Sequence, residues 1–145
     1  MNNKNYGQPV RIERTFRAQP HAVFNAWIAP DVIRKWLFVG PDSEIARVEI
    51  DARPGGRFSI LERGTLGDVD HFGEYNIIAR PTKLGFTLEV PRHFPGVTRI
   101  LIELSAATYD KTLLVLTQTG VDVAVTELSW NKMFDQLATL LEAFK

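Results

Sequence analysis

The three histidines are the first residues that could carry chemistry, because imidazole serves both as a metal ligand and as an acid or base. None of His21, His71 and His93 lies three or four residues from another histidine or an acid on an expected helix, as a helical zinc site requires. The chain has no cysteine, so thiolate catalysis and cysteine-ligated zinc are excluded. The sequence predicts no metal site and no cofactor.

His71 differs from the other two histidines because it lies in an alternating, strand-like segment. It shares one face of that segment with Tyr75 and Ile77. Glu74 and Asn76 take the opposite, polar face. We expect His71 and Tyr75 to point toward the covered side of a sheet, where a histidine is either a hydrogen-bonded structural residue or an acid–base group.

Two carboxylates, Glu62 and Glu103, share strand faces with apolar residues. A carboxylate on such a face can act as a general base, but near a strand end it is more often solvated or paired with an arginine, which we favour here. No serine lies in a Gly-x-Ser-x-Gly motif, and Gly55-Gly56 falls in a turn with no helix after it. We therefore assign no catalytic residue and no nucleotide site.

The spacing of apolar residues along the chain predicts the strands and helices that position these residues. Residues 10–16 alternate as a strand, and two short helices follow, the first beginning at Pro20 and the second after Ala29-Pro30. The alternation then recurs over 44–51, 57–62, 71–78, 84–90, 97–106 and 112–119, with turn residues between the segments. In the first of these turns, Arg53-Pro54-Gly55-Gly56, we expect a type II geometry with a positive φ at Gly55.

After Gly120 the pattern returns to helical spacing up to residue 145, with Asp122 as the expected N-cap. One apolar stripe runs along this helix through Trp130, Met133, Phe134, Leu137, Leu141 and Phe144. A sheet with one apolar face must be covered, and this helix alone is long enough to cover it. The fold class is therefore α+β, a curved antiparallel sheet of about six to seven strands wrapped around a long C-terminal helix.

The length of the chain limits the number of domains, and its charge limits the classes of binding partner. The chain has 145 residues, which favours a single domain over 1–145 with residues 1–9 as a frayed polar lead-in. Seventeen basic and seventeen acidic residues leave no net charge, which argues against nucleic acid and anionic membranes as partners. With no secretory signal and no apolar run of the roughly 18 residues that a membrane span needs, we expect a cytoplasmic protein, monomeric or homodimeric.

Several short motifs occur together in a characteristic order: Val23-Phe24-Asn25-Ala26-Trp27 before Trp36, then Arg53–Phe58, Gly73-Glu74-Tyr75, Thr112–Leu116 and Ser129-Trp130. In this order the sequence resembles the START-like helix-grip (SRPBCC) superfamily. It resembles most closely the bacterial stand-alone relatives of the C-terminal domain of the activator of the heat-shock-protein-90 ATPase. The resemblance implies a cavity between sheet and C-terminal helix that holds apolar or amphipathic small molecules, and it transfers no catalytic set.

If such a cavity is present, the aromatic residues on the covered faces of the sheet and the helix are the expected ligand contacts. The expected apolar walls and the two polar residues that would orient a ligand are Trp36, Phe58, Ile60, His71, Tyr75, Phe86, Leu88, Ile102, Trp130 and Phe134. The leading hypothesis is non-enzymatic binding of a small hydrophobic or amphipathic molecule. The alternatives are a cyclase or hydrolase that uses His71, Tyr75 or Glu62 as acid–base groups, and, ranked lowest, a chaperone-binding protein that stimulates a heat-shock ATPase in the stress response.

Overall fold

A computed structural model of the chain describes residues 8–143. Residues 1–7 of the expected lead-in and Phe144 of the helical stripe lie outside the described residues. Within them, none of the helices combines the length and the apolar character that crossing a bilayer requires.

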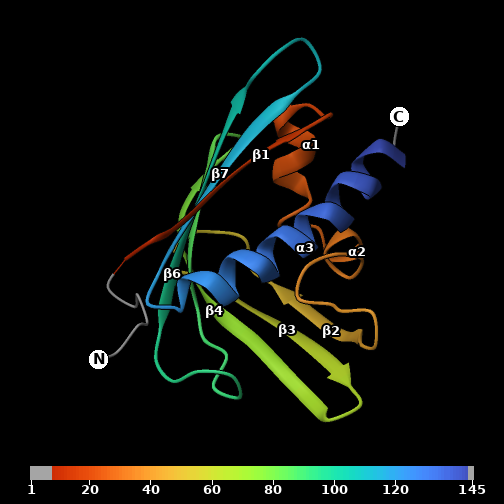
Figure 1. The fold of residues 1–145 in the computed structure, drawn as a ribbon. Helices are drawn as coiled ribbons and strands as arrows, with labels where there is room; N and C mark the ends of the chain where they lie inside the picture. Colours follow the sequence, from red (N-terminus) through yellow and green to blue (C-terminus); the bar gives the residue numbers. More distant parts are fainter. Residues whose placement is uncertain (1–7, 144–145) are drawn as a thin grey trace.

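Seven antiparallel strands form one sheet in the order β1-β7-β6-β5-β4-β3-β2, and a long helix, α3 (Val123–Ala143), lies across one side of it (Figure 1). The strands are β1 (Val10–Phe16), β2 (Glu44–Ile50), β3 (Arg57–Gly64), β4 (Gly67–Ala79), β5 (Lys83–Leu88), β6 (Thr98–Ala106) and β7 (Thr112–Thr119). The expected α+β helix-grip fold is confirmed.

Two short helices, α1 (Pro20–Asn25) and α2 (Pro30–Ile33), follow β1. Each begins at a proline, which fits the first helical turn because no N–H donor is needed there. Helix α2 has only four residues. Trp36 and Leu37 therefore lie in the turn after it, yet both are buried.

The local signals for turns and caps are confirmed. Gly55 has a φ of 83°, and the Gly56 N–H donates to the Arg53 carbonyl at 2.8 Å, which closes the expected turn. At the start of α3, the Val125 N–H donates to Asp122 Oδ1 at 3.1 Å, so Asp122 is the N-cap.

Strand β4 lies between β3 and β5 in the sheet. Its first part, up to Glu74, pairs with β3, and from Tyr75 onward it pairs with β5, with a bulge between Tyr75 and Ile77. His71 and Tyr75 point inward as expected and are 6% and 3% exposed. The prediction that Ile77 shares their face is wrong, since Ile77 is 39% exposed, because the extra residue in the bulge inverts the alternation.

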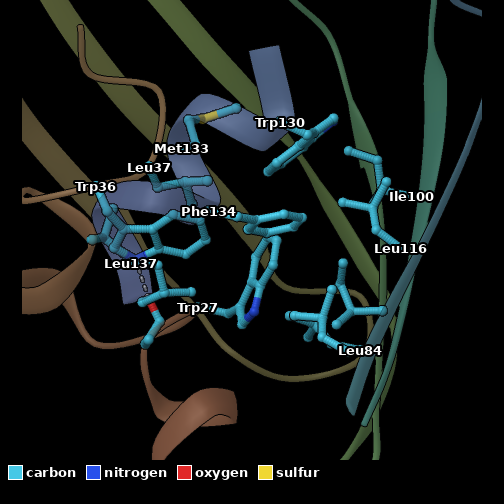
Figure 2. Packing of buried hydrophobic residues seen from close by; sticks show 14 of the residues in the cluster. Trp27, Trp36, Leu37, Leu84, Ile100, Leu116, Trp130, Met133, Phe134 and Leu137 are labelled. Carbon is cyan, nitrogen blue, oxygen red and sulfur yellow. Dashed lines mark hydrogen bonds between the residues drawn. The ribbon is translucent and has the colours of Figure 1, made fainter. Parts of the chain in front are cut away.

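Helix α3 packs on the sheet and on the turns that follow α1 and α2 through an aromatic cluster (Figure 2). The ring of Phe134 lies 6.2 Å from the rings of both Trp27 and Trp36, and 5.6 Å from that of Trp130. Trp27 and Trp36 meet edge to face at 4.8 Å. Since rings at such separations and tilts attract beyond their apolar area, this cluster fixes the helix against the elements that precede β2.

Candidate functional site

A cavity of about 450 Å³ lies between the N-terminal half of α3 and the strands β4, β5 and β7. Buried apolar side chains form much of its wall, among them Leu88, Val90, Val121 and Trp130. Val125, on the first turns of α3, is 69% exposed and forms part of the rim. A concave apolar site of this volume with a few polar groups is typical of a small-molecule pocket.

The structure divides the ten predicted ligand residues among three environments. His71, Leu88 and Trp130 line the main cavity. A separate chamber of about 10 Å³, with room for one water molecule at most, is lined by four others: Phe58, Ile60, Tyr75 and Phe86. The remaining three line neither space and belong to the buried core: Trp36, Ile102 and Phe134.

Three of the cavity residues that were not among the predicted ligand contacts are Phe38, Gln118 and Met133. Gln118 had a usable signal, because it continues the inward alternation of Leu114 and Leu116 and so places an amide on an apolar face. Phe38 had none, since it lies in a turn without periodicity.

A chain of buried hydrogen bonds joins α3 to the sheet beside the cavity. Trp130 Nε1–H donates to Gln118 Oε1 at 2.8 Å, and Gln118 Nε2–H donates to Thr98 Oγ1 at 3.1 Å. The Thr98 hydroxyl in turn donates to the Leu88 carbonyl at 3.1 Å. Because each buried polar group finds its partner on a different element, the chain holds α3, β7, β6 and β5 in one arrangement.

His71 presents a neutral imidazole to the cavity. Burial lowers its pKa below the ordinary value of 6.5, against the opposing effects of the Glu62 carboxylate and the Ile60 carbonyl. His71 Nδ1 lies 3.3 Å from the Ile60 carbonyl, which can only accept, so the proton of the neutral ring lies on Nδ1. Nε2 is then an acceptor, and Glu62 Oε1, itself an acceptor, is 3.8 Å away, too far for a hydrogen bond.

The candidate acid–base groups are not assembled for proton transfer. Glu62 lies beyond hydrogen-bonding distance of His71, and Tyr75 lines the small chamber instead of the main cavity. Burial, and to a smaller extent the Asp51 carboxylate, raises the pKa of the Tyr75 phenol, which keeps it protonated. Glu103 pairs opposite Lys83 on the outward face of β6 and is exposed. The arrangement therefore fits ligand binding through hydrogen bonds better than acid–base catalysis, which would need two of these groups close together.

The charge around the cavity disfavours anions. Among the described residues that line it, none is a lysine or arginine, whereas Asp122 is an acid and the Glu62 carboxylate lies 3.8 Å from His71 Nε2. The positive end of the α3 dipole is already balanced by Asp122 at the N-cap. The cavity therefore suits neutral or cationic molecules.

The lowered pKa of His71 predicts an acid-sensitive fold. Between its ordinary pKa and the lowered native one, the unfolded chain binds a proton that the native state excludes, so the free energy of unfolding should decrease as the pH falls below about 6.5. Chemical denaturation between about pH 7.5 and about pH 5 measures this loss, which should be smaller in His71→Gln. His21→Gln, at an exposed position on α1, should keep the wild-type loss, and equal losses in all three proteins would contradict the prediction.

The cavity and the sheet that surrounds it can be compared with known proteins. The family model described as activator of Hsp90 ATPase homolog 1-like protein matches residues 17–142. The chain belongs to this family. None of the curated proteins compared with the sequence matches it.

Solved structures share the fold along nearly the whole chain. A protein from Chromobacterium violaceum is 25% identical and superposes with a TM-score of 0.82, over 92% of this chain and 96% of its own. An AHSA1-like protein from Aeromonas hydrophila is 23% identical, with a TM-score of 0.80 and coverage of 94% and 93%. A Plasmodium falciparum protein described as an HSP90 activator is 18% identical, with a TM-score of 0.68 and coverage of 95% and 96%.

Proposed function

We propose that this member of the family binds a small, uncharged hydrophobic or amphipathic molecule in the main cavity. The observation that carries the proposal is the cavity of about 450 Å³ with buried apolar walls, into which His71 brings a neutral imidazole. An apolar body would contact Leu88, Val90 and Trp130, and a hydroxyl or N–H of the ligand would donate to His71 Nε2.

Two alternatives rank below binding. Enzymatic activity of the cyclase or hydrolase type has less support, because His71, Glu62 and Tyr75 form no hydrogen-bonded pair. Chaperone binding is supported by the likeness to the HSP90 activator from Plasmodium falciparum, at 18% identity. Among the described residues, no surface feature gives further support for chaperone binding.

A pair of matched fluorescent probes tests the binding proposal. N-phenyl-naphthylamine is neutral, and anilinonaphthalene sulfonate is the same ring system with an added anion. We expect saturable binding of the neutral probe, and binding about tenfold weaker for the sulfonate, since one like charge near the site costs roughly 1.4 kcal/mol. Asp122→Asn, which retains a capping side chain, should reduce this difference.

A second pair of variants places the probe in the cavity. Ser129 and Lys132 are both exposed on α3, but only Ser129 lines the cavity. Ser129→Trp should fill the space from the rim and weaken binding of N-phenyl-naphthylamine by at least about tenfold, the loss of a few buried methylene equivalents. Lys132→Trp should leave it unchanged. A wild-type protein that does not bind the neutral probe, or equal affinities in both variants, would overturn the proposal.

A further inference from the structure

Phe38 lies between the main cavity and the small chamber, since it lines both. It is the one residue, among all those described, that lines both spaces. It lies in the segment between α2 and β2, outside any helix or strand, and is half-buried. The walls of the two spaces therefore share one side chain, and this side chain lies on a turn.

The backbone at Phe38 is in a conformation that this residue type avoids. Its φ is 62°, and it is the one non-glycine residue within 8–143 with a positive φ. Left-handed geometry is disfavoured for a bulky side chain. The position of the ring is therefore maintained by its contacts and not by the local backbone preference.

Those contacts can be exchanged for contacts with a ligand. The Phe38 ring stacks on the imidazole of His71 at 4.3 Å with an angle of 6° between the planes. The Phe38 N–H donates to Met133 Sδ at 3.2 Å, and a thioether is a weak acceptor on a flexible side chain. Since His71 and Met133 both line the main cavity, a bound molecule can take over these partners.

Trp27, one of the residues that line the small chamber, carries an unused hydrogen-bond donor. Trp27 lines this chamber and is 3% exposed, and its Nε1 is the one buried side-chain nitrogen or oxygen without a hydrogen-bond partner among the described residues. Buried donors are nearly always paired, so an orphan beside a cavity indicates a missing acceptor.

We propose that Phe38 is a movable partition that determines how deep a ligand reaches. With its ring displaced, the main cavity and the chamber join into one elongated site, which ends at Trp27 and Tyr75. A long molecule then enters the chamber, where Trp27 Nε1–H can donate to an acceptor atom on its inner end. This inference rests on the proposed function and adds to it a preference for elongated ligands with such an acceptor.

Competition with primary alcohols tests the partition. Butanol and decanol displace N-phenyl-naphthylamine from the wild type and from variants, and the ratio of their affinities reports the usable depth. Each further buried methylene strengthens binding by about fourfold, so two more methylenes admitted in Phe38→Ala should raise the decanol-to-butanol ratio by about fifteenfold. Phe38→Leu, a milder change, should raise it less. Phe94→Ala is the matched control, because Phe94 is half-buried and lines only the main cavity.

The three tryptophans give a second measurement that needs no variant at Phe38. Each indole N–H produces one signal in a proton–nitrogen correlation spectrum of the wild type. Butanol should shift the signal of Trp130, which lines the main cavity, and decanol should shift those of Trp130 and Trp27. The signal of Trp36, which lines neither space and donates to the Ala26 carbonyl at 3.0 Å, should stay in place.

The outcomes separate the inference from the proposed function. A ratio that is unchanged in folded Phe38→Ala and Phe38→Leu, or a Trp27 signal that responds equally to both alcohols, would overturn the partition while leaving binding intact. A ratio that rises equally in Phe94→Ala would also overturn it, since the effect would then come from a wider mouth. If the wild type binds neither the probe nor the alcohols, the proposed function fails, and the partition fails with it.

Discussion

Trp130→Ala should lower the free energy of unfolding by on the order of 3 to 5 kcal/mol, the range for deleting a large buried aromatic side chain. Trp130 is 2% exposed, and its ring lies 5.7 Å from that of Trp27. The substitution would also leave Gln118 Oε1 without its donor in a buried site, a further cost. Denaturant-induced unfolding followed by circular dichroism measures the change.

Leu128→Ala is the matched control for this prediction. Leu128 lies on the same helix but is 59% exposed, so its replacement should change stability by no more than about 0.5 kcal/mol. A loss below about 1 kcal/mol for Trp130→Ala would mean that α3 does not pack with that face against the sheet.

Gly73→Ala should destabilise the protein by on the order of 4 kcal/mol, although the change adds a single methyl group. A Cβ at this position would lie 1.9 Å from the carbonyl oxygen of Thr87 and 3.0 Å from Cε1 of Phe58. The first of these atoms belongs to the backbone of β5, so relief of the overlap requires a strand to move. Gly73 pairs with Phe58 of β3 and lies just before the residues of β4 that pair with β5. Strands β4 and β5 approach too closely there for any side chain.

Gly64→Ala tests whether this cost comes from the close approach. Gly64 also lies in a strand, but a Cβ there would meet nothing closer than 3.8 Å. Its replacement should be neutral or stabilising by up to about 1 kcal/mol, because alanine reduces the freedom of the unfolded chain. Similar losses at Gly73 and Gly64, measured by thermal unfolding, would show that the contact with Thr87 does not govern the effect.

Much of the fold could be predicted from local patterns because those patterns have local causes. Alternation of apolar residues marks the strands, since one face of the sheet is covered and successive side chains point to opposite sides. The residue types at Gly55 and Asp122 identify a turn and a helix cap because each satisfies a need of its own backbone. The stripe from Trp130 to Leu141 predicted the covered face of α3 for the same reason.

The candidate site depended on more than these patterns. The alternation placed His71 and Tyr75 on the inward side, but it could not reveal the bulge after Tyr75 that turns Ile77 outward, because a bulge depends on how β4 pairs with β5. Nor could it tell which inward residues border a space and which pack against one another. Phe86 and Trp130 are both buried aromatics, yet only Trp130 lines the main cavity.

The sequence by itself therefore determined the class of fold, the covered faces and the lack of a recognisable catalytic motif, since these follow from residue types and their spacing. Only the tertiary structure decided where empty space remains, because a cavity is what the packing of distant elements leaves unfilled. It brought the turn at Phe38, strand β4 at His71 and helix α3 at Met133 together around one space. No periodicity links these three segments, and their meeting creates both the cavity and its partition.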